Sequence, residues 1–149
     1  MPIDQMRHGW RLRHGRVSIP DQVYSVTLVT RGRWPGLADL SVARRVIGSL
    51  REMDETGHSE TLAFCLMPDH LHWLFRLRHR DGLSGVVGQF KGRSARRIPL
   101  LRWQRGFHDH AARDDVDLRR LARYIVSNPV RAGLVCRVGD YPYWDAVWL

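Results

Sequence analysis

The chain has 149 residues and a mass of 17.4 kDa, and 44% of its residues are hydrophobic, which is enough for the core of one compact domain. Its formal net charge of +9 and sequence pI near 10.9 predict a polyanion as partner, because basic groups placed on phosphates release condensed counterions. The sequence lacks the roughly 18-residue apolar run of a membrane span and the apolar centre of a signal peptide, so a cytoplasmic location is expected. Its two cysteines are single and widely spaced, a pattern typical of neither a disulfide framework nor a paired metal site.

Arginine accounts for all but one of the 24 basic residues, and Lys91 is the exception. Guanidinium groups suit bidentate contacts to phosphate and guanine better than ammonium groups do, which favours a nucleic acid among polyanions. A GC-rich genome would give the same bias through its codons, so both explanations stay open. The chain starts with a basic arm of about residues 1–20, in which Trp10 could stack an unpaired base.

The first half of the chain predicts a strand, a helix and a hairpin. Residues 23–30 alternate as a strand, and a helix is expected from Ser41, as its cap, to about Asp54. Residues 61–66 and 70–77 are two further strands, joined by a tight connection at Pro68.

The second half predicts two helices separated by a weak strand. A helix with Ser84 as a plausible cap is expected to extend to about residue 98, followed by a strand over residues 103–111. The third helix is expected over residues 114–128, opened by Asp114 and stopped by Pro129. This order of elements predicts an α+β fold, a ferredoxin-like sandwich with a mostly antiparallel central sheet, as a single domain over residues 1–149.

An aromatic tail of about residues 140–149 follows the last predicted helix. So much apolar surface is not expected to remain in water, so the favoured interpretation is a closing strap packed on the core. The alternative is a lid that lies along a DNA groove near Tyr124.

His70 and His72 are the sharpest local feature of the sequence. Side chains alternate along a strand, so both imidazoles project from one face with their Cα atoms about 6.6 Å apart. The opposite face carries the predicted core residues Leu71, Trp73, Phe75 and Leu77, which leaves the histidine face, with Arg76, free for chemistry. Neutral imidazoles bind divalent transition metals, although a structural pair of histidines fits the spacing equally well.

A second pair of the same spacing, His108 and His110, flanks Asp109 in a less regular stretch. For this pair a surface or DNA-contacting role is favoured over metal binding.

Tyr124 lies at the boundary between the apolar and the basic sides of the third predicted helix. Asn128 follows at i+4, so its amide oxygen and the phenol can address the same point. On spacing alone, an ordinary boundary tyrosine and a helix that ends before Pro129 are the favoured interpretation of the two residues. Spacing alone therefore leaves open whether they are a nucleophile and a metal ligand.

The second predicted helix presents a polar stripe beside a run of glycines, which would permit close approach of a DNA backbone. A solvated basic face is the alternative. Together with the arm, the third helix and the second histidine pair, the expected DNA-binding residues are Gln89, Lys91, Arg93, Arg96, Arg120, Arg123, His110 and Trp10.

Four linked motifs in chain order resemble the REP-associated tyrosine transposases of the HUH superfamily. They are LMPDHLHW at 66–73, QFK with SAR at 89–96, WQRGFHDH at 103–110 and ARYIVSNPVRAGLV at 122–135. The resemblance implies a divalent metal, Mg²⁺ or Mn²⁺, with His70 and His72 as ligands and Asn128 as the third. It also implies that Tyr124 is the single catalytic nucleophile.

The resemblance further implies a metal-dependent endonuclease and strand transferase that cleaves single-stranded DNA beside REP hairpins through a 5′-phosphotyrosine intermediate. Such an enzyme would act in the bacterial cytoplasm, at the nucleoid, as a monomer or a dimer. Two other classes stay in view. One is a non-catalytic regulator that binds hairpin DNA and derives from a transposase, and the other is a metal hydrolase without a covalent step.

Overall fold

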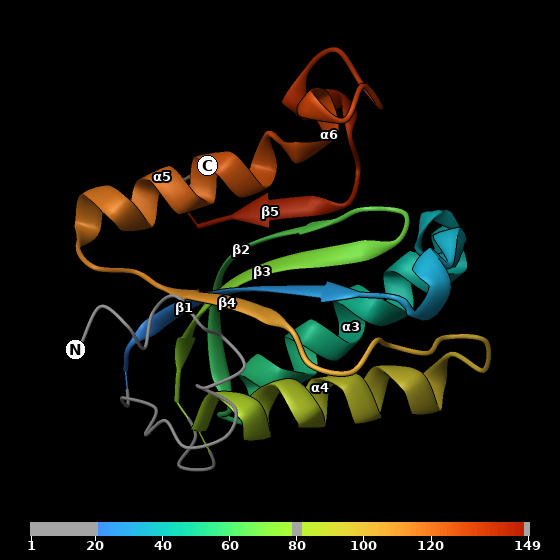
Figure 1. Cartoon of the computed structure of the whole chain (residues 1–149), viewed down its shortest axis with the longest axis horizontal. Coiled ribbons are helices and arrows are strands. Elements are labelled where there is room, and N and C mark those ends of the chain that lie inside the picture. The colour runs from blue at the N-terminus through green and yellow to red at the C-terminus, as the bar shows by residue number, and fades with distance from the viewer. Residues whose placement is uncertain (1–20, 79–81, 148–149) are drawn as a thin grey trace.

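A five-stranded antiparallel sheet forms the centre of the computed structural model, which describes residues 21–78 and 82–147. Its strands lie in the order β4-β1-β3-β2-β5 (Figure 1). Their bounds are β1 Val23–Val29, β2 Ser59–Leu66, β3 His70–Leu77, β4 His108–Ala111 and β5 Trp144–Ala146. The order of the first four strands confirms the predicted ferredoxin-like sandwich, and β5 extends the sheet beside β2.

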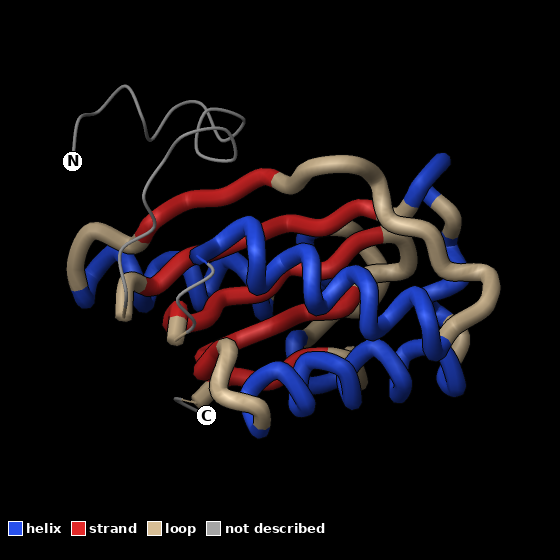
Figure 2. Tube along the Cα trace, turned by 90° about the horizontal axis from the view of Figure 1, so that it is seen from below, coloured by secondary structure: helices blue, strands red, loops and turns tan. Residues whose placement is uncertain are grey.

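Helices cover both faces of this sheet. The helices α3 (Leu40–Glu55) and α4 (Gly82–Arg97) cover one face, and α5 (Asp115–Val126) covers the other (Figures 1 and 2). A short helix α6 (Asn128–Arg131) follows α5 directly. Three single turns complete the connections, η1 Arg31–Arg33, η2 Pro35–Ala38 and η3 Val138–Asp140. None of the helices in residues 21–78 and 82–147 has the length and apolar character needed to cross a membrane.

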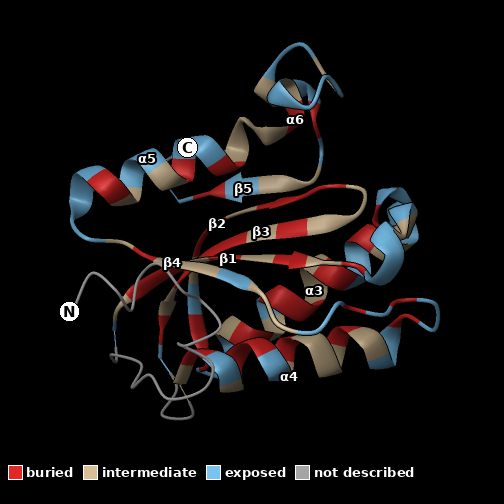
Figure 3. Ribbon diagram, viewed as in Figure 1, coloured by how far each residue is buried: buried red, intermediate tan, exposed pale blue. Residues whose placement is uncertain are grey.

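The larger core lies between the sheet and the pair α3 and α4 (Figure 3). Period-two alternation along β3 sends Leu71, Trp73, Phe75 and Leu77 into it, each at most 1% exposed, as the sequence predicted. The Trp73 ring stacks on Phe75 at 4.0 Å between centroids. The centre of this side of the sheet is therefore filled with large side chains.

A smaller core lies under α5, on the histidine face of the sheet. Leu74 of β3 is fully buried there and packs with Ala63, Ala122 and Ile125. The prediction that this face is free for chemistry is therefore wrong in part. Helix α5 covers the part of this face that carries Ala63 and Leu74.

Three predicted helix boundaries differ from those in the structure. The N-cap of α3 is Asp39 and not Ser41, because its carboxylate accepts the backbone N–H of Val42. Ser84 lies inside the first turn of α4, which begins at Gly82. Pro129 does not stop a helix but opens α6, where its missing N–H has no partner to lose.

The predicted strand at 103–111 is also shorter in the structure. Only His108–Ala111 pairs with β1 as a strand, and Trp103 forms a single bridge with Thr30. Its indole donates instead to Ser94 of α4, which holds the connection against the helix.

The aromatic tail joins the sheet. Ala63 and Cys65 of β2 pair with Ala146 and Trp144 of β5, and the buried Tyr141 hydroxyl donates to the Leu66 carbonyl at 2.6 Å. This is the strap arrangement favoured by the sequence. Trp10 and the rest of the N-terminal arm lie outside the described residues, as do the last two residues of the tail.

Candidate active site

The register of the central strands places the two histidines of β3 beside β1. His72 lies opposite Thr27 and His70 lies opposite Val29. The two imidazole rings meet edge to face with centroids 4.8 Å apart. Two nitrogen donors therefore converge on one point of the sheet, as the alternation of a strand requires.

Each imidazole is oriented through its Nδ1 atom. The Nδ1–H of His70 donates to Asp69 Oδ1 at 2.7 Å, and Nδ1 of His72 lies 3.2 Å from Thr27 Oγ1. Burial alone would raise the pKa of Asp69, but hydrogen bonds from His70 and Arg33 outweigh it, so the pKa is lowered and the carboxylate stays ionised. Such partners fix the ring and leave the Nε2 atoms available to a metal.

The surroundings of His72 shift its pKa downwards. Burial, together with the nearby charges of His70 and Arg131, lowers its pKa to about 4. At neutral pH the His72 ring is therefore uncharged, which is the form that binds metals.

Tyr124 reaches this pair from α5. Its ring lies edge to face with His72 at 6.4 Å between centroids, and 55% of the residue is exposed. The Arg131 guanidinium of α6 lies over the same ring, 3.8 Å from its centroid. The phenol thus stands at the seam predicted from the sequence, beside the histidines and open to solvent.

Asn128 is the first residue of α6 and is half-buried. Ser127, which joins α5 to α6, keeps right-handed helical angles, so Asn128 stays about one helical turn beyond Tyr124. The structure thus preserves the spacing that made Asn128 a candidate ligand.

The chemistry of these donors suits a divalent cation. Within residues 21–78 and 82–147 no group of three or more His, Cys, Asp or Glu side chains forms a metal-binding cluster. Two oriented imidazoles could supply two ligands, and an amide such as that of Asn128 could be the third protein donor. A set of this size leaves coordination positions open for a substrate.

The second histidine pair lies on the same face of the sheet, on edge strand β4. His108 is opposite Thr27, which in turn is opposite His72, so β1 separates the two pairs. His110 has a structural partner, since its Nε2 lies 3.2 Å from Oδ2 of Asp117 in α5.

Asp117 joins the start of α5 to β4. Only 3% of the residue is exposed, and its carboxylate accepts bonds from Arg113, Arg120 and His110. Burial would raise the pKa of Asp117, but the hydrogen bonds, led by that from Arg120, hold it well below its usual range. The helix that carries Tyr124 is therefore fastened to the sheet at its first turn.

Replacing this carboxylate gives a pH-dependent prediction. Asp117→Asn is expected to lower the free energy of unfolding by about 1–3 kcal/mol at pH 7, because a buried charged acceptor is lost. The folded-state pKa is depressed, so this stability is present above about pH 4 and is lost as the pH falls below it. Urea unfolding at pH 7 and pH 3 measures the difference.

Asp140→Asn is the matched control, because Asp140 is half-exposed and pairs with the exposed Arg137. Its effect should stay below about 0.5 kcal/mol at both pH values. An Asp117→Asn variant as stable as this control at pH 7 would contradict the fastening role.

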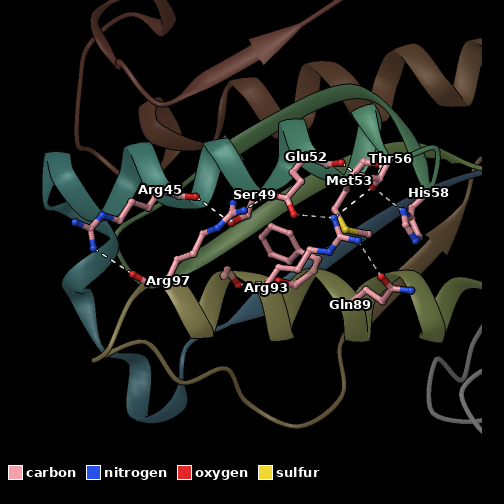
Figure 4. Close-up of polar contacts among 11 residues, drawn as sticks. Arg45, Ser49, Glu52, Met53, Thr56, His58, Gln89, Arg93 and Arg97 are labelled. Atoms are coloured by element: carbon pink, nitrogen blue, oxygen red, sulfur yellow. Dashed lines mark hydrogen bonds and ion pairs between the residues drawn. The ribbon is translucent and has the colours of Figure 1, made fainter.

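Most of the expected DNA contacts of α4 already have partners within the protein. Arg93 donates to Glu52 of α3 and to Gln89, and its side chain is only 17% exposed (Figure 4). Lys91 donates to the carbonyls of Gln104 and Gly106. These residues lie on the helix layer opposite α5, away from Tyr124.

The remaining candidates are more accessible. Arg96 at the end of α4 and Arg123 on α5 are exposed, and Arg120 is exposed while it pairs with Asp117. Of these, Arg120 and Arg123 share a helix with Tyr124.

Sequence reasoning missed four residues that shape the site, namely Thr27, Asp69, Asp117 and Arg131. Asp69 had a signal, since a carboxylate directly precedes the first histidine. Arg131 also had a signal, because a residue seven positions beyond Tyr124 lies on the same side of a continuous helix. The prediction that the helix ends at Pro129 excluded that interpretation. Thr27 had none, because only the strand register places it beside His72.

Known proteins resemble this chain in sequence and in fold. The family model "Transposase IS200 like" matches residues 18–128. A REP-associated tyrosine transposase of Escherichia coli K12 is 33% identical over 86 residues, which cover 56% of this chain and 52% of that protein. A Haemophilus influenzae protein that bears this name provisionally is 35% identical over 100 residues, covering 56% of this chain and 57% of the relative. The chain thus spans little more than half the length of these curated relatives.

Solved structures show the same fold. A REP-associated tyrosine transposase bound to a REP hairpin superposes with a TM-score of 0.77 at 26% identity, covering 87% of this chain and 79% of that chain. A provisionally assigned transposase from Deinococcus radiodurans gives a TM-score of 0.56 at 24% identity and supports the fold alone, covering 74% of this chain and 93% of that chain. The resemblance drawn from the four motifs is thereby confirmed, and the chain belongs to the IS200-like transposase family.

Proposed function

We propose that this chain cleaves and rejoins single-stranded DNA beside REP-type hairpins through a covalent 5′-phosphotyrosine on Tyr124. The observation that carries the proposal is the meeting of an exposed tyrosine with two oriented histidines, His72 at 6.4 Å and His70 beside it. Family membership supports DNA cleavage and rejoining in general. The REP hairpin is proposed as the substrate because the similar transposase of known structure is bound to one.

The chemical step follows from the groups present. The phenol oxygen of Tyr124 attacks the scissile phosphorus, a bond forms between them, and the bond from phosphorus to the 3′ oxygen breaks. The phenol loses its proton, and the departing oxygen gains one to become a 3′ hydroxyl. The phosphotyrosine keeps the energy of the broken bond, so reversal of the step rejoins a strand without ATP.

A divalent cation, Mg²⁺ or Mn²⁺, is the proposed cofactor, with His70, His72 and Asn128 as its ligands. When bound, such an ion neutralises charge on the scissile phosphate. Asp69 and Thr27 hold the two imidazoles in the required orientation. The low pKa of His72 keeps its ring neutral and able to coordinate at any physiological pH.

We propose that DNA binds mainly along α5. Arg123 is exposed on the helix of the nucleophile, and Arg120 is exposed there while it pairs with Asp117. By contrast, Arg93, Gln89 and Lys91 are engaged on the opposite helix layer. Arg96 is accessible at the end of α4, whereas His110 already bonds to Asp117. Trp10 remains a proposed stacking residue of the arm.

The test is incubation with a labelled REP-hairpin oligonucleotide and Mn²⁺, followed by a denaturing gel. A protein band that carries the DNA label is expected from the unaltered chain. Hairpin binding with no such band would instead indicate a non-catalytic regulator, and cleavage without a covalent band would indicate a metal hydrolase.

Histidine variants in the same assay decide which pair holds the metal. His70→Ala or His72→Ala is expected to lower metal-dependent cleavage by at least about 100-fold while the protein stays folded. His108→Ala is the matched control, since it lies in the same row of the same sheet face, and it should keep cleavage within about threefold of the unaltered chain. A loss confined to His108→Ala would assign the metal to the second pair, and equal losses in all three variants would contradict a site built on the first pair alone.

A further inference from the structure

Arg131 lies against the nucleophile, yet the function proposed above gives it no part. Its guanidinium carbon is 3.8 Å from the centroid of the Tyr124 ring, which is a close cation–π stack. The same guanidinium donates to the backbone carbonyl of Tyr124 at 2.8 Å and to the hydroxyl of Ser127. One side chain of α6 therefore grips both the ring and the backbone of Tyr124.

These contacts span the break between two helices. Tyr124 lies in the last turn of α5, and Arg131 is the last residue of α6. Because α6 begins at Asn128, a bond from its far end back to Tyr124 fixes the turn that carries Asn128 relative to the phenol. The contacts of Arg131 thus fix the position of Tyr124 relative to Asn128, and the proposed function places both residues at one phosphate.

Tyr124 is exposed, so its ring needs contacts of this kind to stay in one position. At 55% exposure the ring is not held by a surrounding core, and its ring contacts in the described residues are with His72 at one side and Arg131 at the other. A free side chain samples several rotamers and loses entropy when it is fixed for reaction. A ring that is already fixed avoids that loss at the moment of attack.

We propose that Arg131 is a positioning residue for Tyr124, holding the phenol ring beside His72 and in register with Asn128. The part that concerns cleavage rests on the function proposed above. Arginine suits this role better than lysine, because its flat guanidinium stacks on a ring while it donates to two acceptors. A lysine would keep the charge but not the flat stack.

The position of the ring can be measured without DNA or metal. In protein labelled with 3-fluorotyrosine, Tyr124→Phe identifies the ¹⁹F resonance of Tyr124. Arg131→Gln is expected to shift and sharpen that resonance, because the stacked ring is released, and Arg131→Lys should do so partly. Arg137→Gln is the matched control, since that exposed arginine of the same segment pairs only with Asp140 among the residues described and should leave the resonance unchanged.

Single-turnover cleavage of a REP-hairpin oligonucleotide tests the consequence. Arg131→Gln is expected to slow covalent linkage about 10- to 100-fold while the hairpin Kd stays within about threefold, because a misplaced nucleophile affects reaction more than binding. Arg131→Lys should fall between Arg131→Gln and the unaltered chain, and Arg137→Gln should match the latter.

The outcomes separate this inference from the proposed function. An unaltered chain that forms no covalent product contradicts the proposed function, while the ¹⁹F measurement still decides whether Arg131 positions the ring. An unshifted resonance, or linkage within twofold of the unaltered rate, overturns the positioning role. A loss of rate matched by an equal loss of hairpin affinity also overturns it, since Arg131 would then bind DNA. If Arg131→Gln fails to fold, Arg131→Lys provides both measurements.

Discussion

Tyr124→Phe is expected to abolish covalent linkage to DNA while the hairpin Kd stays within about threefold. The substitution removes one oxygen atom from a side chain that is 55% exposed, so the core under α5 is not disturbed. The ring that Arg131 stacks on is retained, and so is the edge contact with His72. Denaturing gels measure the linkage, and binding titration on the same hairpin measures the affinity.

Tyr143→Phe is the matched control, because it removes the same atom from a half-buried tyrosine of the tail. It should leave linkage unchanged. Cleavage by Tyr124→Phe at the same phosphate, leaving a 5′ end free of protein, would contradict the phosphotyrosine mechanism and favour hydrolysis.

The sequence was sufficient for the parts of the fold that depend on local periodicity. Alternation along β3 predicted that Leu71, Trp73, Phe75 and Leu77 are buried on one side of the sheet. It also predicted that His70 and His72 project from the other side. The apolar stripe of α5 placed Tyr124 at the edge of the covered surface, and Asp114 was correctly predicted to cap this helix. These features follow from neighbours within one element.

The sequence was insufficient where a residue's role depends on a partner far along the chain. A helical projection showed that Gln89 and Arg93 share one side of α4 but not that this side meets α3. Glu52, 41 residues away, takes the Arg93 guanidinium that was expected to face DNA. Likewise, Thr27 becomes an orienting partner of His72 only through the register of β1 on β3.

Helix ends were the least predictable local feature. Asp39 and Ser41 are both good capping residues, and the choice between them depends on where the turn η2 delivers the chain. Pro129 fits the end of one helix and the start of another equally well, and the structure uses it for the second. The assumed helix end at Pro129 also hid a contact in the candidate site. The chain continues into α6, and this continuation brings Arg131 back to Tyr124.

Deleting residues 144–149 is expected to lower the free energy of unfolding by about 2–4 kcal/mol and the melting temperature by about 10 °C. The deletion removes β5, exposes the edge of β2 and uncovers Ala63 and Cys65 in the core under α5. Val147→Ser is the matched control within the same segment, since Val147 is 62% exposed, and its melting temperature should stay within about 2 °C of the unaltered protein. Thermal unfolding followed by circular dichroism measures both variants.

A lid over the DNA groove predicts the reverse, namely an unchanged melting temperature with an altered cleavage rate or cleavage site. That result would contradict the strap, because an edge strand that pairs with β2 and covers Cys65 cannot be removed without loss of stability.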